Sequence, residues 1–332
     1  MTTRVFTGLK PTGQLQVGNY LGAIRPLLDL AADPDNDVLV CVADLHALTV
    51  EHNPSQLREL TLEMAATLVA CELNPRATLF IQSSVAAEHT ELSYLLESTA
   101  TYGEMSRMVQ FKEKAKAQGA GSTRLSLLTY PALMAADILA HQTEVVPVGD
   151  DQRQHLELTT TLARRFNTRY GHVFTVPQGV TPAETARIKD LREPTTKMGK
   201  TGSDGAGVIF LRDNPDDIAA KVRRAVTDSD TSLHYDPSSR PGVSNLATLL
   251  GALTGMTPEQ ALVGLTGSGQ LKQAVTVALV DTLGPIQKRY QDLRADPGHL
   301  RDLLIAGRDF ASASAATTVA AAREAIGLLD LA

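Results

Sequence analysis

The segment PTGQLQVGNYLG (Pro11–Gly22) contains three glycines and lies between a predicted strand and a predicted helix. The residues before it, RVFTGL at 4–9, have the apolar character of a short buried strand, and residues 19–30 have the pattern of a helix. The glycine spacing differs from that of a dinucleotide-binding turn. A strand, a glycine-rich turn and a helix in this order predict the first unit of a parallel sheet.

Three further apolar segments, at residues 37–44, 77–84 and 144–151, are predicted strands that alternate with helices. One of these helices is predicted to start at Asn53, because asparagine followed by proline is a typical helix N-cap. This alternation is typical of parallel βαβ units. We therefore predict an α/β fold with a Rossmann-like, doubly wound parallel sheet, which binds ligands beyond the carboxyl ends of its strands.

The second half of the chain has a helical character. Helix patterns cover residues 214–226, 257–265 and 271–283, and an alanine-rich helical stretch continues to the C-terminus. We predict three parts: a catalytic domain over residues 1–202 with an insertion at about 85–145, a helical domain over 203–297, and a C-terminal helix over 298–332.

The composition is that of an ordinary globular protein, with 43% hydrophobic and 20% charged residues and a net charge of −6. This charge argues against general coating of nucleic acid but allows a local basic surface. The N-terminal residues lack the features of a secretory signal, and no apolar run approaches the roughly 18 residues of a membrane span. We therefore expect a cytoplasmic protein without membrane contact, in which Cys41 and Cys71 are buried free thiols.

Two features of the chain are suited to phosphate. Backbone N–H groups near Gly18 and Asn19, at the start of a predicted helix, have no acceptors within that helix, and helix N-termini attract anions. In addition, segment 186–201 has five basic residues against two acidic ones, and segment 107–116 has four against one. Neither segment is a Walker A loop, and the second also fits a solvated helix face. Together these features are suited to hold a polyphosphate and stabilise charge on a leaving group.

Six motifs in order resemble the bacterial tryptophanyl-tRNA synthetases, a family of class I aminoacyl-tRNA synthetases. They are PTGQLQVGNYLGAI (11–24), DLHALT (44–49), GEMSRMVQFKEK (103–114), TYPALMAADIL (129–139), VPVGDDQRQHLEL (146–158) and AVTDSD (225–230), and KMGKT (197–201) resembles the lysine-loop signature of the class. The resemblance implies an enzyme that uses ATP to attach L-tryptophan to tRNA(Trp) through a tryptophanyl-adenylate. It also implies a homodimer with its contact in the 85–145 segment, and a helical half that binds the anticodon end of the tRNA.

The resemblance further implies roles for individual residues. Lys114, Lys197 and Lys200 would be the catalytic residues, acting on the pyrophosphate. The ATP site would comprise Lys10, Pro11, Thr12, Gly18, Asn19, Gly149, Asp150, Asp151, Ile188, Lys197, Met198, Gly199, Lys200 and Thr201. The tryptophan site would comprise Phe6, Gly8, His46, Tyr130, Met134, Asp137, Ile138, Val146, Val148 and Gln152. Mg²⁺ would be bound through the phosphates, with no metal held by protein ligands alone.

Substrate selection would depend on Asp137. Indole has a single hydrogen-bond donor, its N–H, which a buried carboxylate can accept. A phenylalanine side chain would leave that charge without a partner, and sites built around a substrate's polar group reject such analogues by ~10⁴–10⁵ without editing. Without the resemblance, an aspartate in this helix would be interpreted as a residue that caps or pairs locally. The adenylation itself needs no protein base, because the substrate carboxylate is ionised at neutral pH.

Four positions differ from the residues usual in the family. Gln16 replaces Thr or His, Lys10 replaces Gln, and Gly199 and Thr201 replace serines in the lysine loop. We expect activity with altered nucleotide kinetics, and the sequence leaves open whether this is a housekeeping enzyme or an auxiliary, inhibitor-tolerant one. The rival interpretations are a tyrosyl-tRNA synthetase, a binding paralogue without chemistry, and a simple adenylyltransferase.

Overall fold

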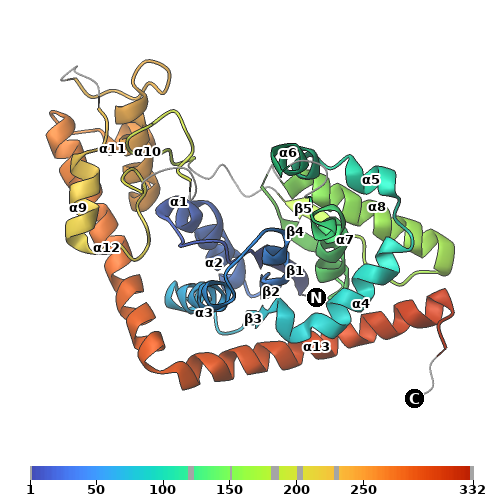
Figure 1. Ribbon diagram of the computed structural model, residues 1–332. Helices are drawn as coiled ribbons and strands as arrows, with labels where there is room; N and C mark the ends of the chain where they lie inside the picture. The colour runs from blue at the N-terminus through green and yellow to red at the C-terminus, as the bar shows by residue number, and fades with distance from the viewer. Residues whose placement is uncertain are drawn as a thin grey trace.

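The computed structural model describes residues 2–118, 123–149, 152–180, 187–199, 205–227 and 232–329, without the side chains of Lys114, Ala117 and Gln118. A parallel sheet of five strands lies in its centre, in the order β3-β2-β1-β4-β5 (Figure 1). The strands are β1 (Thr3–Leu9), β2 (Asn36–Val42), β3 (Thr78–Ile81), β4 (Val145–Pro147) and β5 (Gln178–Val180). This order is that of a doubly wound sheet and confirms the predicted α/β fold class.

Helices connect the strands and follow the sheet. In the first part they are α1 (Val17–Asn19), the π-helical turn η1 (Tyr20–Ile24), α2 (Arg25–Ala32), the 3₁₀ turn η2 (Leu45–Thr49), α3 (Pro54–Ala70), the 3₁₀ turn η3 (Gln82–Val85), α4 (Ala86–Glu97), α5 (Tyr102–Ser106), α6 (Val109–Gln118), α7 (Leu125–Leu139) and α8 (Arg153–Tyr170). In the second part they are α9 (Pro215–Arg223), α10 (Pro241–Thr254), α11 (Pro258–Ala261), α12 (Ser268–Ala295) and α13 (Pro297–Ile326).

The local predictions differ from the structure mainly where strands end. The segment predicted as one strand at 77–84 leaves the sheet after Ile81 and continues as η3. The strand predicted at 144–151 ends at Pro147, a residue with no N–H for the next backbone hydrogen bond. The first change brings the polar residues Gln82, Ser83 and Ser84 out of the strand and onto the carboxyl edge of the sheet. The helix expected at 19–30 begins earlier, at Val17, and passes through η1 into α2.

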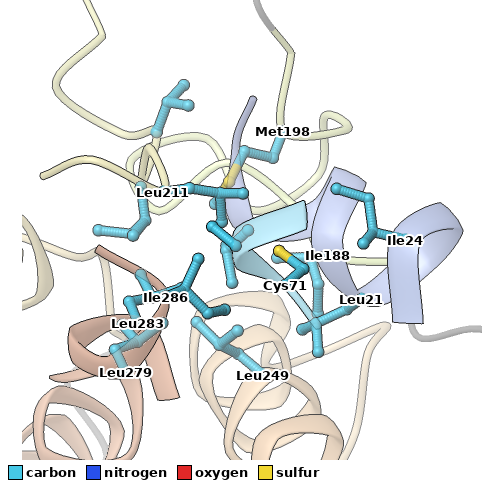
Figure 2. Close-up of a cluster of buried hydrophobic side chains, with 14 of the residues drawn as sticks. Leu21, Ile24, Cys71, Ile188, Met198, Leu211, Leu249, Leu279, Leu283 and Ile286 are labelled. Carbon is cyan, nitrogen blue, oxygen red and sulfur yellow. The ribbon is translucent and has the colours of Figure 1, made fainter. Parts of the chain in front are cut away.

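One buried apolar cluster joins the sheet to the helical half. It includes Val40 of β2 and Leu68 of α3 together with Leu246 of α10 and Leu279 of α12. Figure 2 shows Met198 and Ile188 in this cluster, with Leu21 and Ile24 of η1 on one side and residues of α10 and α12 on the other. The base of the lysine loop is therefore packed into the core. The domain boundary predicted at residues 202 and 203 lies outside the described residues.

The C-terminal helix α13 returns from the helical half to the sheet. It runs along β3 and α4, at the bottom of the view in Figure 1. Its closest approach to the sheet is at Gly307, where a Cβ atom would lie 1.8 Å from the carbonyl oxygen of Leu79. Cys41 and Cys71 are both buried free thiols, as expected. None of the described helices combines the length and apolar character that a membrane span requires.

We expect Gly307→Ala to lower the free energy of unfolding by about 1–3 kcal/mol, because the added methyl group must push α13 away from β3. Gly284→Ala on α12 is the control, since a Cβ there meets no atom within 4 Å. It should be neutral or stabilise the protein by up to about 1 kcal/mol, through helix propensity. Urea unfolding of both variants and of the unsubstituted protein checks the prediction. Equal free energies of unfolding for Gly307→Ala and Gly284→Ala would contradict it.

Candidate active site

A buried carboxylate lies at the carboxyl edge of the sheet. Asp137, on α7, is 3% exposed. Its oxygens accept hydrogen bonds from His46 Nε2 at 2.8 Å, from His89 Nδ1 at 2.7 Å, and from Gln82 Nε2 at 2.7 and 2.8 Å. His46 lies on η2 and Gln82 on η3, the turns that follow β2 and β3. The ends of two neighbouring strands thus supply donors to a single acceptor.

These hydrogen bonds determine the charge of Asp137. Burial by itself raises the pKa of this carboxyl group, but the hydrogen bonds from His46 and His89 lower it below its ordinary value. Asp137 is therefore ionised at neutral pH, and an ionised carboxylate can only accept hydrogen bonds. A group of this kind is suited to bind a single N–H donor in an otherwise apolar pocket.

The interpretation of Asp137 as a residue that pairs locally is wrong. Its partners are 48, 55 and 91 positions away in the sequence, so helical spacing could not reveal them. Gln82 had one sequence signal, because it lies near the carboxyl end of a predicted strand. His89 had no such signal, since its chain neighbours are Glu88 and Thr90, and it is fully buried.

The apolar residues that the resemblance implies for the pocket form a cluster next to this carboxylate in the chain, through Ile138. Phe6 of β1, Ile138 of α7, Val146 of β4 and Val148 belong to one buried cluster, and Met134 packs against it. A Cβ at Gly8 would lie 3.8 Å from the Phe6 ring, so this position on β1 is close to the pocket wall. The structure therefore brings five of the residues predicted for the pocket, Phe6, Met134, Ile138, Val146 and Val148, into one cluster, and their role toward a substrate stays a prediction.

Two polar residues predicted for the tryptophan site lie beside this cluster. The hydroxyl of Tyr130 is hydrogen-bonded to His155 Nε2 at 2.5 Å, and burial raises the pKa of Tyr130 to about 12. Its ring lies edge-on to His46, with centroids 6.2 Å apart. Gln152 is the N-cap residue of α8. Tyr130 is thus a neutral hydroxyl held close to the residues that surround Asp137.

The expectation of unpartnered N–H groups at the start of the first helix is wrong. Val17 N donates to Ile209 O, Asn19 N and Tyr20 N donate to Gln16 O, and Gly18 N donates to the Gln16 side chain. A Cβ at position 18 would lie 2.8 Å from the Gln16 side-chain oxygen, so a larger residue there would require the Gln16 side chain to shift. A phosphate can reach the Gly18 N–H only if the Gln16 side chain moves away.

Gln16 also connects this segment to the lysine loop. Its Nε2 donates to the carbonyl of Met198 at 3.0 Å, and Met198 N donates to Ile188 O at 3.2 Å. Gln16, Ile188 and Met198 are all buried. The residue that replaces the family's usual Thr or His therefore bridges the two signature segments. A threonine would be too short to make the same two contacts.

The remaining predicted ATP-site residues fall into two groups. Lys10 Nζ donates to Thr49 Oγ1 at 3.1 Å, Pro11 is buried, and Thr12, Gly149, Lys197 and Gly199 are exposed. The others, Asp150, Asp151, Lys200, Thr201 and the side chain of Lys114, lie outside the described residues. Among the residues that are described, no group of three or more His, Cys, Asp or Glu side chains is arranged to hold a metal ion.

A pH dependence follows from His141, which is fully buried beside this site. Burial, followed by the neighbouring His89, lowers the pKa of His141 from 6.5 to about 3. Between these values the unfolded chain binds a proton that the folded protein does not, so stability falls as the pH is lowered. From pH ~6.5 to ~5 this residue should account for a loss of about 2 kcal/mol.

We therefore expect the free energy of unfolding of His141→Phe to fall less over this pH range than that of the unsubstituted protein. Urea unfolding at several pH values measures the difference. His172→Phe, at an exposed position, should keep the original pH dependence. Parallel pH profiles for His141→Phe and the unsubstituted protein would contradict the prediction.

Comparison with known proteins agrees with this geometry. Residues 1–284 match the family described as tRNA synthetases class I (W and Y). The chain is 50% identical to tryptophan–tRNA ligase 1 of Streptomyces avermitilis over 330 residues, which is 98% of this chain and 99% of the relative. It is also 50% identical to tryptophan–tRNA ligase 1 of Streptomyces coelicolor, with 98% of both chains covered.

Solved structures give the same result. The tryptophanyl-tRNA synthetase of Mycoplasma pneumoniae superposes with a TM-score of 0.87 at 36% identity and covers 99% of both chains. That of Campylobacter jejuni, in complex with ADP and tryptophan, has a TM-score of 0.84 at 28% identity and covers 98% of this chain and 100% of its own. The chain thus belongs to the class I tRNA synthetases and, within them, to the bacterial tryptophanyl-tRNA synthetases.

Proposed function

We propose that this chain is an ATP-dependent tryptophan–tRNA ligase that forms tryptophanyl-adenylate and then transfers the tryptophanyl group to tRNA(Trp). Its family and its full-length relatives support this function. The observation that carries it is the ionised Asp137, which is buried at the carboxyl edge of the sheet, next to Ile138 of an apolar cluster. The housekeeping and auxiliary alternatives share this activity, and both remain compatible with it.

In the first step a carboxylate oxygen of tryptophan attacks the α-phosphorus of ATP. The bond from that phosphorus to the oxygen that bridges to the β-phosphate breaks, and pyrophosphate leaves. The nucleophile is already ionised, so the protein has to position the reactants and stabilise charge on the leaving group. We assign the second task to Lys114, Lys197 and Lys200. Mg²⁺ bound through the phosphates would neutralise further charge.

Selection of tryptophan rests on the donors around Asp137. His46, His89 and Gln82 all donate to the carboxylate, so it faces a ligand as an acceptor that can take the indole N–H. A tyrosyl-tRNA synthetase would need a tyrosine and an aspartate that bind a substrate hydroxyl together. Tyr130 is instead bonded to His155 and Gln110. This arrangement favours tryptophan over tyrosine.

The ATP site that we propose lies between the entrance segment and the lysine loop. Pro11, Gly18 and Asn19 lie on one side, and Met198 and Lys197 on the other, with the Gln16 side chain joining the two. Because ATP would have to displace Gln16 to reach the Gly18 N–H, its binding is coupled to the position of the loop. This coupling is a physical reason to expect altered nucleotide kinetics.

A homodimer and a tRNA-binding helical half complete the proposal. Large apolar side chains are exposed in the 85–145 segment, where Tyr94 is 72%, Tyr102 74% and Leu125 74% exposed. Exposed aromatic and aliphatic groups of this size are typical of a surface that a partner covers. We assign the dimer contact to this segment and the anticodon contact to the helices from α9 to α12.

Asp137→Asn is the first test. We expect kcat/KM in tryptophan-dependent ATP–pyrophosphate exchange to fall about 10- to 100-fold, because a charged hydrogen bond to the indole is lost. The ratio of kcat/KM for tryptophan to kcat/KM for phenylalanine should fall in the same variant. Asp29→Asn, at an exposed position on α2, is the control and should behave like the unsubstituted protein. Exchange that depends on tyrosine, or on no aromatic amino acid, would refute the proposed function.

Lys197→Ala tests the leaving-group role. We expect kcat for exchange to fall about 10²–10³-fold with little change in the KM for tryptophan, because the lysine acts on charge that develops in the transition state. Lys288→Ala, at an exposed position on α12, should leave exchange unchanged, since this reaction does not involve tRNA. A raised KM for tryptophan at unchanged kcat would contradict the assignment.

A further inference from the structure

A row of hydrogen bonds leads from Asp137 away from the pocket to the C-terminal helix. His89 Nδ1 is 2.7 Å from Asp137 Oδ1, and His89 Nε2 is 3.1 Å from His141 Nε2. His141 Nδ1 is 3.3 Å from Ser314 Oγ, which lies 3.4 Å from Arg4 Nη1. We call the five residues Arg4, Ser314, His141, His89 and Asp137 the Asp137 relay. They come from β1, α13, the turn after α7, α4 and α7.

The two ends of the relay fix the direction of its hydrogen bonds. Arginine can only donate, and an ionised carboxylate can only accept. His89 must therefore donate through Nδ1 to Asp137. When the His89 ring is neutral, its Nε2 is an acceptor and takes a hydrogen bond from His141 Nε2–H. His141 Nδ1 then accepts from the Ser314 hydroxyl, and Ser314 Oγ accepts from Arg4.

This ordering uses each donor and acceptor along the relay once. If His89 carried a positive charge, both of its nitrogens would donate, and His141 would have to donate to Ser314 through Nδ1. Ser314 Oγ would then accept from both Arg4 and His141, and its own hydrogen would have no acceptor within the relay. The neutral ordering leaves no hydrogen between Ser314 and Asp137 without an acceptor, and His141 is fully buried, where water cannot replace a missing partner.

Packing holds the middle of the relay in place. The His141 ring is stacked on Phe6, with centroids 5.9 Å apart, and meets Phe80 edge-on at 5.6 Å. His89 meets the same Phe80 ring at 6.0 Å. Phe6 is a wall of the proposed indole pocket, so His141 lies directly behind that wall. The two histidines are therefore confined to the ring positions that the hydrogen bonds require.

We propose that His141 and Ser314 are positioning residues for substrate recognition by Asp137, and that the C-terminal helix thereby takes part in tryptophan selection. The nitrogen of a histidine that carries its proton is set by the hydrogen bond that the other nitrogen makes. His141 and Ser314 thus keep the Nδ1 proton of His89 directed at Asp137 Oδ1. Without them His89 can change its tautomer and withdraw this donor, which leaves Asp137 Oδ1 with Gln82 as its remaining donor. The inference rests on the proposed function.

Substitutions at Ser314 distinguish the effect of its hydroxyl group from the effect of how α13 packs. Ser314→Thr keeps the hydroxyl, whereas Ser314→Val has nearly the same shape as threonine without it. Ser312→Ala is the matched control on the same helix, because Ser312 bonds to Glu88 of α4 and lies outside the relay. His141→Phe keeps an aromatic ring against Phe6 and removes both hydrogen bonds.

The readout is ATP–pyrophosphate exchange with tryptophan and with phenylalanine. We expect Ser314→Val and His141→Phe to raise the KM for tryptophan about threefold to tenfold, with an unchanged KM for ATP and weaker discrimination against phenylalanine. Ser314→Thr and Ser312→Ala should match the unsubstituted protein. Equal kinetics for Ser314→Val and Ser314→Thr would overturn the inference, and this pair remains decisive if His141→Phe does not fold.

A second measurement needs no substrate. Nitrogen-15 NMR of the full chain, labelled at its histidines, reports which ring nitrogen carries the proton. We expect His89 as the Nδ1–H tautomer and His141 as the Nε2–H tautomer at neutral pH, with His141 altered in Ser314→Val. A His141 with its proton on Nδ1 would overturn the inference even if tryptophan-dependent exchange is normal. Absence of that exchange in the unsubstituted protein would refute the proposed function, whatever the tautomers are.

Discussion

The candidate site depends on keeping one buried carboxylate ionised. Removing a charge from water is costly unless donors replace the lost hydration, and Asp137 obtains these donors from three separate segments. That requirement explains why η2 and η3 follow β2 and β3 directly, since each turn delivers a donor to the same point. It also explains why polar residues are buried within an otherwise apolar cluster. The acceptor that we propose for the indole N–H is therefore already positioned and charged.

The second constraint is the contact between the entrance segment and the lysine loop. Gln16 caps the short helix α1 and holds the Met198 carbonyl. Since Met198 and Ile188 are packed into the core shared with the helical half, the base of the loop is held by both apolar burial and a hydrogen bond. A change in this contact therefore affects the site and the helical half together. The expectation of phosphate held by unpartnered N–H groups failed because Gln16 and Ile209 already accept from them.

The return of α13 to the sheet links the end of the chain to its beginning. Gly307 allows the helix to lie against the backbone of β3, and Ser314 then comes within reach of Arg4 and His141. The segment predicted as a C-terminal helix thus contacts His141, a residue next to the candidate site. The same chain segment that stabilises the edge of the sheet can therefore influence substrate recognition.

The sequence by itself determined the α/β class, because the alternation of apolar strands and helices and the Asn-Pro caps are local properties. The family resemblance also predicts roles for Asp137 and its apolar neighbours, because ordered motifs retain the positions of a site. Only the tertiary structure decided which groups contact that carboxylate. Gln82 and His89 reach Asp137, and His141 reaches His89, through contacts between distant segments, and the Gln16 side chain contacts Met198, which is 182 positions away. Spacing along a helix or strand carries no information about such contacts, since they depend on how the elements pack.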